Sequence, residues 1–356
     1  MSGSLRLRRI GSHVVTSPTP ASGDAAPLGV AVVGAGRMGT FHAHNLAGMP
    51  GATVPIVVDV VEDAAQELAA AVGAEATTDL AAALARTDVG AVVITVTSAA
   101  HHEAILAAAA AGKHVFVEKP VSNSIADGRA MIAACEEAGV VLAVGHSYRR
   151  NGALRHLKHL IDSGELGRIS LAEGVFSNDN GLKLKPGVWR TDPAEIPGGC
   201  LMQIGIHQID NLLYLLGDAG EVTAYFNRLE TEPEIEDVTA LLMQFKSGAV
   251  GYVAADYISP RRFTLAIHGT KANAFFDMDN DGLRIQRTGE AAPSPVAYTP
   301  ADHLLVELED FAAAAEGRKP EIDGRDGLLP LAVVLAAAKS SNERRSIPLA
   351  EILGDD

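Results

Sequence analysis

The chain has 356 residues, and its 29 Lys and Arg side chains against 44 Asp and Glu side chains give a formal net charge of −15. This length predicts about two domains, and a hydrophobic share of 47% excludes a disordered chain. The acidic balance argues against a general binder of nucleic acid or of anionic membranes, because both need a positive surface.

The cysteine count and the hydropathy of the chain exclude further classes of protein. Cys135 and Cys200 are the only cysteines, which excludes a disulfide framework and any zinc site built from several thiolates, so no metal site is predicted. Two isolated cysteines are typical of a reducing cytoplasm. No apolar run approaches the ~18 residues of a membrane span, so no membrane partner is predicted.

Residues 1–27 precede the first predicted strand and are predicted to be a flexible leader or the product of a mis-chosen start codon. Arg8 and Arg9 also permit an export signal of the twin-arginine type, which needs an apolar segment of about 7–15 residues behind it. Thr16 to Pro20 interrupt that segment. We therefore favour a leader and a cytoplasmic location over export.

Residues 28–147 alternate between short apolar, Val-rich strands and helices. The predicted strands are 28–33, 54–59, 91–96, 115–117 and 140–144. The predicted helices are 38–49, 62–72, 80–85, 101–111 and 124–138. Strands and helices at this spacing predict right-handed βαβ units and a parallel sheet, and therefore an α/β dinucleotide-binding domain of the Rossmann type.

Residues 148–356 have a different pattern, typical of an α+β domain. The predicted helices are 153–163, 201–216, 302–315 and 327–341. The predicted strands are 169–176, 222–227, 239–245, 250–257, 263–268 and 274–278. Turn signals between the strands predict an antiparallel or mixed sheet. The polar stretch 177–199 has no clear periodicity, and a loop of that length usually has a function.

A glycine-rich turn follows the first predicted strand. Gly34, Gly36 and Gly39 fit the pattern G-x-G-x-x-G, with Arg37 and Met38 opening the next helix. The first glycine permits the tight turn, the second lets the backbone approach a pyrophosphate, and the third lets the helix pack on the strand. The helix N-terminus offers free N–H groups to the phosphates, and Arg37 adds charge. The turn predicts a bound dinucleotide.

Asp59 ends the second predicted strand, 25 residues after Gly34. An acidic side chain at this point accepts hydrogen bonds from the adenosine ribose hydroxyls and repels a 2′-phosphate. Val60 and Val61 follow, so no Arg stands beside Asp59 to hold that phosphate. The sequence therefore predicts NAD rather than NADP.

Three further motifs carry a family resemblance. They are GKHVFVEKP at 112–120, GHSYRR at 145–150 and GGCLMQIGIHQID at 198–210. With the glycine turn, they resemble the glucose–fructose oxidoreductase, inositol dehydrogenase and rhizopine-catabolism (Gfo/Idh/MocA) family over most of the chain from Leu28 onward. The resemblance implies a Rossmann domain and then an α+β domain with a large open, mostly antiparallel sheet. In the family that sheet often carries oligomer contacts, which implies a homodimer or homotetramer.

The resemblance also implies an activity and a set of residues. The activity is hydride transfer between nicotinamide and a secondary alcohol carbon of a sugar, cyclitol, sugar acid or dihydrodiol. The family's catalytic lysine corresponds to Lys119 and its helix histidine to His207. Glu118 corresponds to a Glu near the nicotinamide and its ribose, and His102 to a His near the cofactor. Thr97 lies on the loop expected to line the dinucleotide.

The chemistry requires a base, because alcohol oxidation removes a hydride from carbon and a proton from oxygen. The ordinary pKa of a histidine such as His207 lies near working pH, as a base requires. Burial of Lys119 would either lower its pKa toward that range or leave it charged, so that it stabilises the alkoxide. Members of the family with a full Lys, Asp and His set carry Asp where this chain has Gln203. One helical turn separates Gln203 from His207, so both should share a face. We expect His207 to be the base, Lys119 to polarise the hydroxyl, and Gln203 to position the substrate.

The substrate is predicted from a basic cluster in this acidic chain. Trp189 would form an apolar wall against a ring, while Arg190 would bind hydroxyls or an acid group. Arg149 follows the fifth strand, at the edge where ligands bind. Lys183 and Lys185 add local charge or belong to a solvated loop. These residues favour a polyhydroxylated small molecule that carries an anionic group.

Two alternatives remain beside a dehydrogenase. An NAD-using glycosidase, as some relatives are, would hold its cofactor tightly and show no net reduction of added NAD. A dinucleotide-binding sensor without catalysis would account for Gln203, although the retained Lys119 and His207 count against it.

Overall fold

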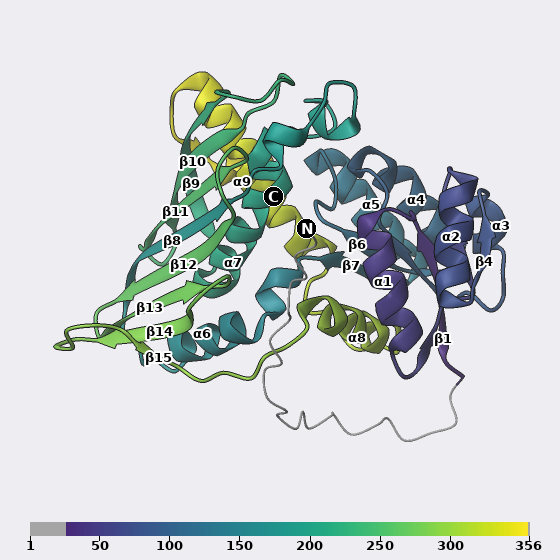
Figure 1. Cartoon of the computed structure of the whole chain (residues 1–356), viewed down its shortest axis with the longest axis horizontal. Coiled ribbons are helices and arrows are strands. Elements are labelled where there is room, and N and C mark those ends of the chain that lie inside the picture. The colour runs from purple at the N-terminus through teal and green to yellow at the C-terminus, as the bar shows by residue number, and fades with distance from the viewer. Residues whose placement is uncertain (1–25, 355–356) are drawn as a thin grey trace, which may run out of the picture.

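The computed structural model describes residues 26–354, so the predicted leader lies almost entirely outside the described residues. The first domain contains β1 Leu28–Val33, β2 Ala52–Thr53, β3 Ile56–Val58, β4 Glu75–Thr77, β5 Ala91–Ile94, β6 His114–Glu118 and β7 Leu142–Gly145. Its helices are α1 Arg37–Gly48, α2 Glu62–Val72, α3 Leu80–Leu84, α4 Ser98–Ala110 and α5 Ile125–Ala138. These elements form the predicted Rossmann domain, at the right of Figure 1.

The strand order of the parallel sheet indicates where a ligand binds. The strands run β4-β3-β1-β5-β6-β7, with β2 paired to β1. The chain moves outward from β1 to β4, then restarts at β5 on the other side of β1. A topological switch point therefore lies between β1 and β5, and ligands bind beyond the carboxyl ends of the strands at such a point.

The second domain is built on a larger sheet. Its strands are β8 Ile169–Ser177, β9 Ala219–Asn227, β10 Val238–Phe245, β11 Val250–Asp256, β12 Arg262–Gly269, β13 Ala272–Asp277, β14 Gly282–Arg287, β15 Ser294–Pro295 and β16 Ile347–Pro348. Its helices are α6 Gly152–Asp162, α7 Ile206–Leu216, α8 His303–Ala315, α9 Gly324–Glu343 and α10 Leu349–Leu353. The order is β15-β14-β13-β12-β8-β11-β10-β9-β16, and all neighbours are antiparallel except β8 and β11. The predicted large, mostly antiparallel sheet is confirmed.

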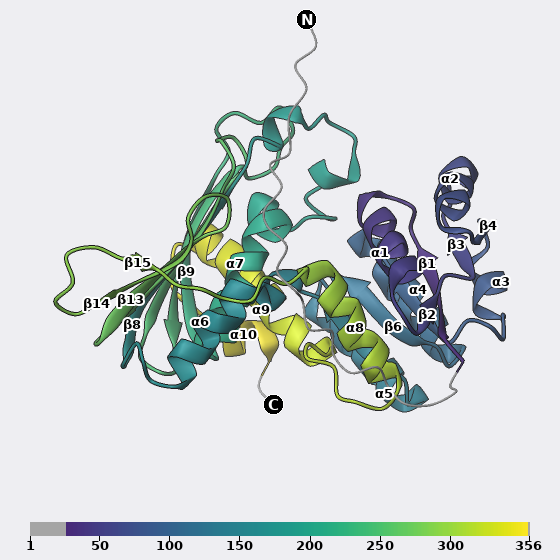
Figure 2. The same ribbon diagram turned by 60° about the horizontal axis from the view of Figure 1, so that its bottom comes forward.

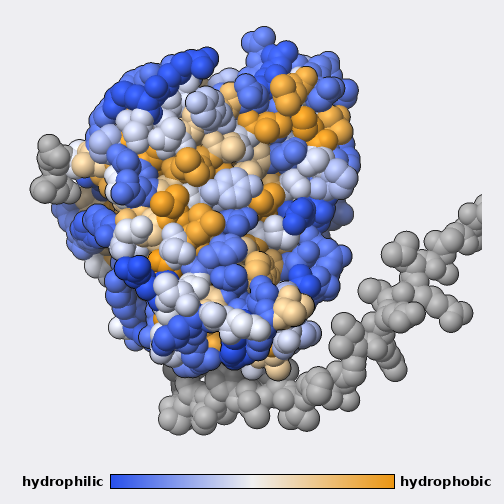
Figure 3. Space-filling model, turned by 90° about the vertical axis from the view of Figure 1, so that its left-hand side faces the viewer, coloured by the Kyte–Doolittle hydropathy of each residue, from blue (hydrophilic) through white to orange (hydrophobic). Residues whose placement is uncertain are grey.

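The two faces of this sheet differ in their cover. Helices α7 and α9 pack on the inner face, which turns toward the first domain (Figures 1 and 2). Buried and exposed side chains alternate along β10, as expected for a sheet with one covered face. Figure 3 shows apolar side chains gathered on the outer face. Large exposed apolar side chains of its strands are Leu171, Tyr225, Leu242 and Val250.

Most predicted elements agree with the structure, and the differences have local causes. Helix α4 begins at Ser98, three residues before the predicted start. The prediction missed the short strands β2, β4, β15 and β16 and the five-residue α10, because elements this short carry little periodicity, and it also missed the six-residue β14. No helix among residues 26–354 is long and apolar enough to cross a membrane.

The C-terminal helices return to the first domain. Helix α8 packs against α1, and α9 packs against α5 and β7 (Figure 2). An isolated bridge also pairs Ala143 of β7 with Asp323. The predicted boundary between residues 147 and 148 therefore separates two sheets, while the helices beyond residue 302 belong spatially to both.

Candidate active site

A deep cleft lies between the two domains at the carboxyl edge of the parallel sheet. Its volume is about 1670 Å³, which exceeds the ~300–1,000 Å³ of ordinary small-molecule pockets. Its wall combines the glycine turn, the ends of β3, β5 and β6, the long loop after β8, and the start of α7. A cleft of this size has room for a dinucleotide together with a second small molecule.

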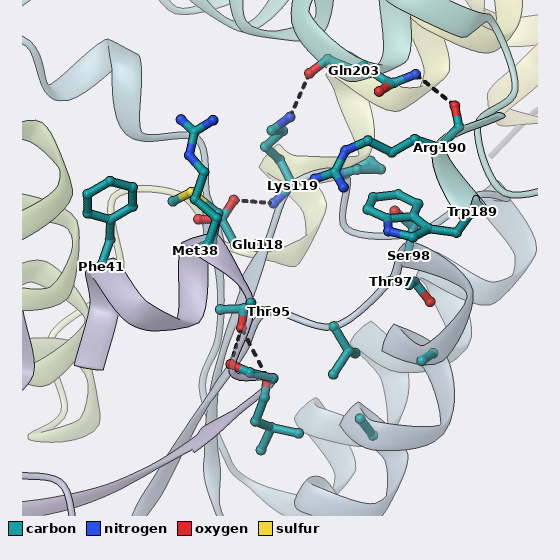
Figure 4. Close-up of a pocket in the computed structure, with 18 of the residues that line it drawn as sticks. Met38, Phe41, Thr95, Thr97, Ser98, Glu118, Lys119, Trp189, Arg190 and Gln203 are labelled. Atoms are coloured by element: carbon teal, nitrogen blue, oxygen red, sulfur yellow. Dashed lines mark hydrogen bonds between the residues drawn. The ribbon is translucent and has the colours of Figure 1, made fainter. Parts of the chain in front are cut away.

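The glycine turn has the geometry that its pattern predicts. Gly34 has a φ of 105°, a conformation that only glycine adopts without strain. A Cβ at Gly39 would lie 1.8 Å from the carbonyl oxygen of Gly34, so the close approach of α1 to this turn requires glycine. The Thr95 hydroxyl donates to that carbonyl at 2.9 Å and fixes the turn (Figure 4). A Cβ at Gly36 would meet no atom within 4 Å, so this backbone is open to a ligand.

Asp59 lies beside this turn on the cleft wall. Its carboxylate accepts hydrogen bonds from the N–H of Ala35 at 2.6 Å and the N–H of Val61 at 2.8 Å. The side chain thus braces the turn and presents negative charge to the cleft. The open turn, the helix N-terminus and this carboxylate fit a dinucleotide whose adenosine ribose carries no phosphate.

The other predicted cofactor residues divide into two groups. Arg37, Met38 and Thr97 line the cleft, as predicted. His102 does not line it, so the structure gives no support to its predicted role. The neighbouring His101 is buried instead, with Nδ1 3.1 Å from the carbonyl oxygen of Pro120. Other residues of this turn of α4, Ala100 and Glu103, do line the cleft.

Lys119 lies where the two domains meet. Its Nζ donates a hydrogen bond to the main-chain carbonyl of Gln203 at 2.8 Å (Figure 4). Burial, which Glu118 opposes and the nearby charges of Arg190 and Arg37 assist, lowers the pKa of Lys119 to about 8. A lysine with this pKa has a substantial neutral fraction at mildly alkaline pH, so it can accept a proton.

Glu118 is held from behind the cleft by groups that the sequence did not reveal. His42 Nε2 lies 2.8 Å from Glu118 Oε1, and the N–H of Lys119 donates to Oε2 at 3.2 Å. The fully buried Glu307 brings a carboxylate oxygen within 4.8 Å of these His42 and Glu118 atoms. Burial and the charge of Glu118 hold the pKa of Glu307 well above its usual range. The Arg150 guanidinium lies 3.9 Å from the Glu307 carboxylate and provides a positive charge beside this cluster.

His207 and Gln203 both line the cleft, as the predicted spacing implied. A π-helical turn, Leu201–Gly205, precedes α7, so Gln203 belongs to that turn and His207 to the α-helix. The His207 ring packs edge-on against Tyr148, with 4.5 Å between ring centroids. Burial, Lys119 and two neighbouring histidines hold the pKa of His207 well below its ordinary value. The imidazole is therefore neutral and a weak base.

Trp189 and Arg190 lie across the cleft from the glycine turn (Figure 4). The Arg190 guanidinium stacks on the Trp189 ring at 4.1 Å. Among the described residues no carboxylate pairs with Arg190, whereas Lys183 and Lys185 each pair with a surface carboxylate. Arg190 thus keeps its charge available to a ligand, and the two lysines are largely neutralised by their partners.

Arg149 is a correction to the predicted substrate site, because its side chain does not line the cleft. The guanidinium forms a two-pronged ion pair with the buried carboxylate of Asp210. It also lies over the ring of Tyr214 at 5.4 Å. Arg149 follows a strand at the binding edge, but Asp210 of α7 draws it into the protein interior.

Several cleft residues were missed because folding alone brings them to the site. Tyr257 follows β11, Arg261 precedes β12, and His303 begins α8. The only available signal was their position at the ends of predicted strands and helices. That signal is weak, because the partners of each end cannot be read from one sequence.

Comparisons with known proteins cover both sheets. A family model described as an oxidoreductase family with an NAD-binding Rossmann fold matches residues 28–146, and the GFO/IDH/MocA C-terminal domain matches residues 154–275. The myo-inositol 2-dehydrogenase of Thermotoga maritima is 30% identical over 342 residues, which cover 91% of this chain and 99% of that enzyme.

Solved structures of oxidoreductases are also similar to this chain over nearly its whole length. An oxidoreductase of Desulfitobacterium hafniense, provisionally named NADPH-dependent, has a TM-score of 0.89 at 37% identity, and the match covers 93% of this chain and 100% of that one. Levoglucosan dehydrogenase in complex with NADH has a TM-score of 0.85 at 26% identity, with 91% and 99% covered. The similarity therefore extends over the nucleotide-binding domain, the large sheet and the cleft between them.

The structural position of Arg149 makes a prediction. Arg149→Ala should lower the free energy of unfolding by ~3–5 kcal/mol, because it leaves the Asp210 carboxylate buried without its partner. Urea denaturation followed by circular dichroism would measure this loss. The exposed Arg325, which pairs with Glu136, offers a matched control, and Arg325→Ala should cost less than ~1 kcal/mol. A stable Arg149→Ala protein with a raised KM would instead restore the substrate-binding role.

Proposed function

Because the chain belongs to the Gfo/Idh/MocA family of oxidoreductases, we propose that it uses NAD to oxidise a secondary alcohol on a polyhydroxylated substrate that also carries an anionic group. The oxidation converts the alcohol and NAD⁺ to a ketone, NADH and a proton. NAD, when bound, accepts the hydride from the alcohol carbon. The observation that carries the substrate class is a set of cations on the cleft wall without carboxylate partners.

Lys119 is the proposed base. Its pKa of about 8 lies near working pH, where proton transfer is most effective, whereas the depressed pKa of His207 makes that imidazole a poor acceptor. The hydrogen bond to the Gln203 carbonyl holds Nζ at the cleft and leaves the lone pair of the neutral amine free for the substrate hydroxyl. His207 then orients the hydroxyl by hydrogen bonding. This assignment reverses the roles expected from the sequence.

The anionic group of the substrate is proposed from charge balance. Arg37 and Arg190 line the cleft, and neither has an ion-pair partner within the described part of the chain. Arg37 stands at the glycine turn, where the cofactor phosphates would use its charge, so Arg190 is the cation proposed to meet the substrate. The position that carries an acid in many relatives is the neutral Gln203. A carboxylate or phosphate on the substrate would pair with Arg190, which presents several donors in one plane.

Assembly and location are proposed on separate grounds. Leu242 and Tyr225 are 54% and 69% exposed on the outer face of the large sheet. Because an apolar patch of this kind marks an interface, we propose a homodimer or homotetramer that covers this face, and sedimentation analysis would count the chains. Cys135 and Cys200 are free thiols, both buried, which suits the proposed cytoplasmic location.

The base assignment predicts a pH profile. We expect kcat/KM for alcohol oxidation to rise as pH approaches about 8 and then to level off, because only neutral Lys119 accepts the proton. Lys119→Ala should lower kcat by ~10²–10⁴. Lys119→Arg keeps the positive charge but cannot lose a proton, so it should be similarly inactive. Fluorescence titration should show unchanged NADH binding in both variants. High activity in Lys119→Arg would show that the charge, not the base, matters.

The cofactor assignment predicts a preference for NADH over NADPH. Asp59→Asn retains an acceptor for the Ala35 N–H but removes the negative charge. The ratio of the Kd for NADPH to the Kd for NADH should therefore fall by at least ~10-fold. This change corresponds to a difference of about 1.4 kcal/mol in binding free energy. Isothermal titration of both cofactors would measure the ratio. A wild-type protein that binds NADPH more tightly than NADH would overturn the assignment.

The substrate class predicts a difference between acids and neutral polyols. Uronic acids or carboxylated cyclitols should have at least ~10-fold higher kcat/KM than their neutral parents. Arg190→Gln should remove this advantage mainly by raising KM for the acid, while the neutral parent changes little. NAD reduction followed by absorbance measures both. Faster turnover of neutral polyols would show that this chain shares the uncharged substrate class of the myo-inositol and levoglucosan enzymes named above.

A further inference from the structure

The Gln203 side chain is occupied by protein partners. Its Oε1 accepts a hydrogen bond from the Tyr257 hydroxyl at 3.0 Å, and its Nε2 donates to the main-chain carbonyl of Arg190 at 3.1 Å. Its own carbonyl accepts from Lys119 Nζ (Figure 4). One residue thus joins the end of β6, the end of β11 and the long loop. These two bonds fix the plane of the amide and leave one N–H and one oxygen lone pair for any further ligand.

The loop that carries Trp189 depends on this contact. Between Pro186 and Pro193, every other hydrogen bond among the described residues is local, such as Thr191 N–H to the carbonyl of Val188. The bond from Gln203 to the Arg190 carbonyl is the one described hydrogen bond from this segment to a distant part of the chain, and it adds to the packing of Trp189 against the core and to the bond from Asn123 to the neighbouring Ala194 carbonyl. It acts directly beside the stacked Trp189 and Arg190 side chains. Loss of this bond should leave both side chains free to move away from the cleft.

Tyr257 supplies a fixed anchor for the amide. Its side chain is buried, its N–H donates to the Asp237 carbonyl at 2.8 Å, and its own carbonyl accepts from the Gly181 N–H at 2.9 Å. Burial raises the pKa of the phenol, so it stays protonated and acts as the donor. A donor at Oε1 forces the amide to turn its NH₂ group toward Arg190.

This geometry explains why an amide rather than a carboxylate occupies position 203. An aspartate or glutamate would accept from the Tyr257 hydroxyl, but its second oxygen has no hydrogen to offer the Arg190 carbonyl. Two acceptors would then face each other, which is unfavourable in a partly buried site. The amide donates and accepts at once from one planar group, which an ionised carboxylate does not do.

We propose that Gln203 and Tyr257 are positioning residues, which together latch the Trp189–Arg190 segment over the substrate end of the cleft. The latch acts on substrate affinity through this segment and takes no part in proton transfer. Its link to substrate affinity rests on the dehydrogenase function proposed above, whereas its effect on the loop does not.

Trp189 provides a direct test, because it is the only tryptophan of the chain. Acrylamide quenching of its fluorescence should be measured without substrate in wild type, Gln203→Glu and Tyr257→Phe. Gln203→Glu has the same shape, loses the donor to Arg190 and adds a negative charge beside Lys119, whereas Tyr257→Phe adds no charge. Both variants should raise the quenching constant at least ~2-fold, because the segment opens more often. Lys185→Met is the matched control: it removes an exposed ion pair of the same loop with Glu232 and should leave quenching unchanged.

Kinetics would separate the latch from a role in chemistry. In both latch variants KM should rise ~10-fold, the cost of one lost hydrogen bond of about 1.4 kcal/mol. In Tyr257→Phe, which adds no charge, kcat should change little, whereas the carboxylate of Gln203→Glu should also raise the pKa of Lys119 and move the pH profile to higher pH. Unchanged NADH binding and circular dichroism would exclude unfolding as the cause. Wild-type quenching in both variants overturns the latch. Absence of any turnover by the wild type would overturn the proposed function, yet the quenching result would still decide the latch.

Discussion

The hydrogen bond from Lys119 to the main-chain carbonyl of Gln203 joins the two domains at the point where chemistry is proposed. A lysine buried there loses hydration, and its pKa falls as a result. The π-helical turn at the start of α7 places a carbonyl within reach of this amine. The long loop after β8, the large sheet of the second domain and the nucleotide-binding edge of the first domain all meet around Lys119 Nζ.

The charges of the cleft follow a simple division. Two of its carboxylates have protein partners: Asp59 braces the glycine turn while facing the cleft, and Glu118 is held by His42. The cations Arg37 and Arg190 have no such partners among the described residues. In a chain with a net charge of −15, a cleft that keeps unpaired cations is the exception to the overall electrostatics. That contrast concentrates attraction for an anion at one place.

Sequence reasoning succeeded where function depends on backbone and spacing. The glycine turn, Asp59, Lys119, Gln203 and His207 all line the cleft, while their roles remain predictions. It failed for His102 and Arg149, because a side chain's direction is decided by a partner far along the chain, such as Asp210 for Arg149. Tyr257 and Glu307 belong to no sequence motif. Folding brings Tyr257 to the cleft wall and Glu307 to the buried side of Glu118.

The return of α8 to the first domain affects how the molecule is made. Leu308 and Phe311 of α8 are buried in one cluster with Leu46 of α1 and Phe116 of β6. A ribosome that has released residues 28–147 has released every strand of the nucleotide-binding sheet but not this cover. The apolar face beside α1 therefore stays open until synthesis has passed residue 311, so the nucleotide-binding domain completes its core only after most of the second domain has been made.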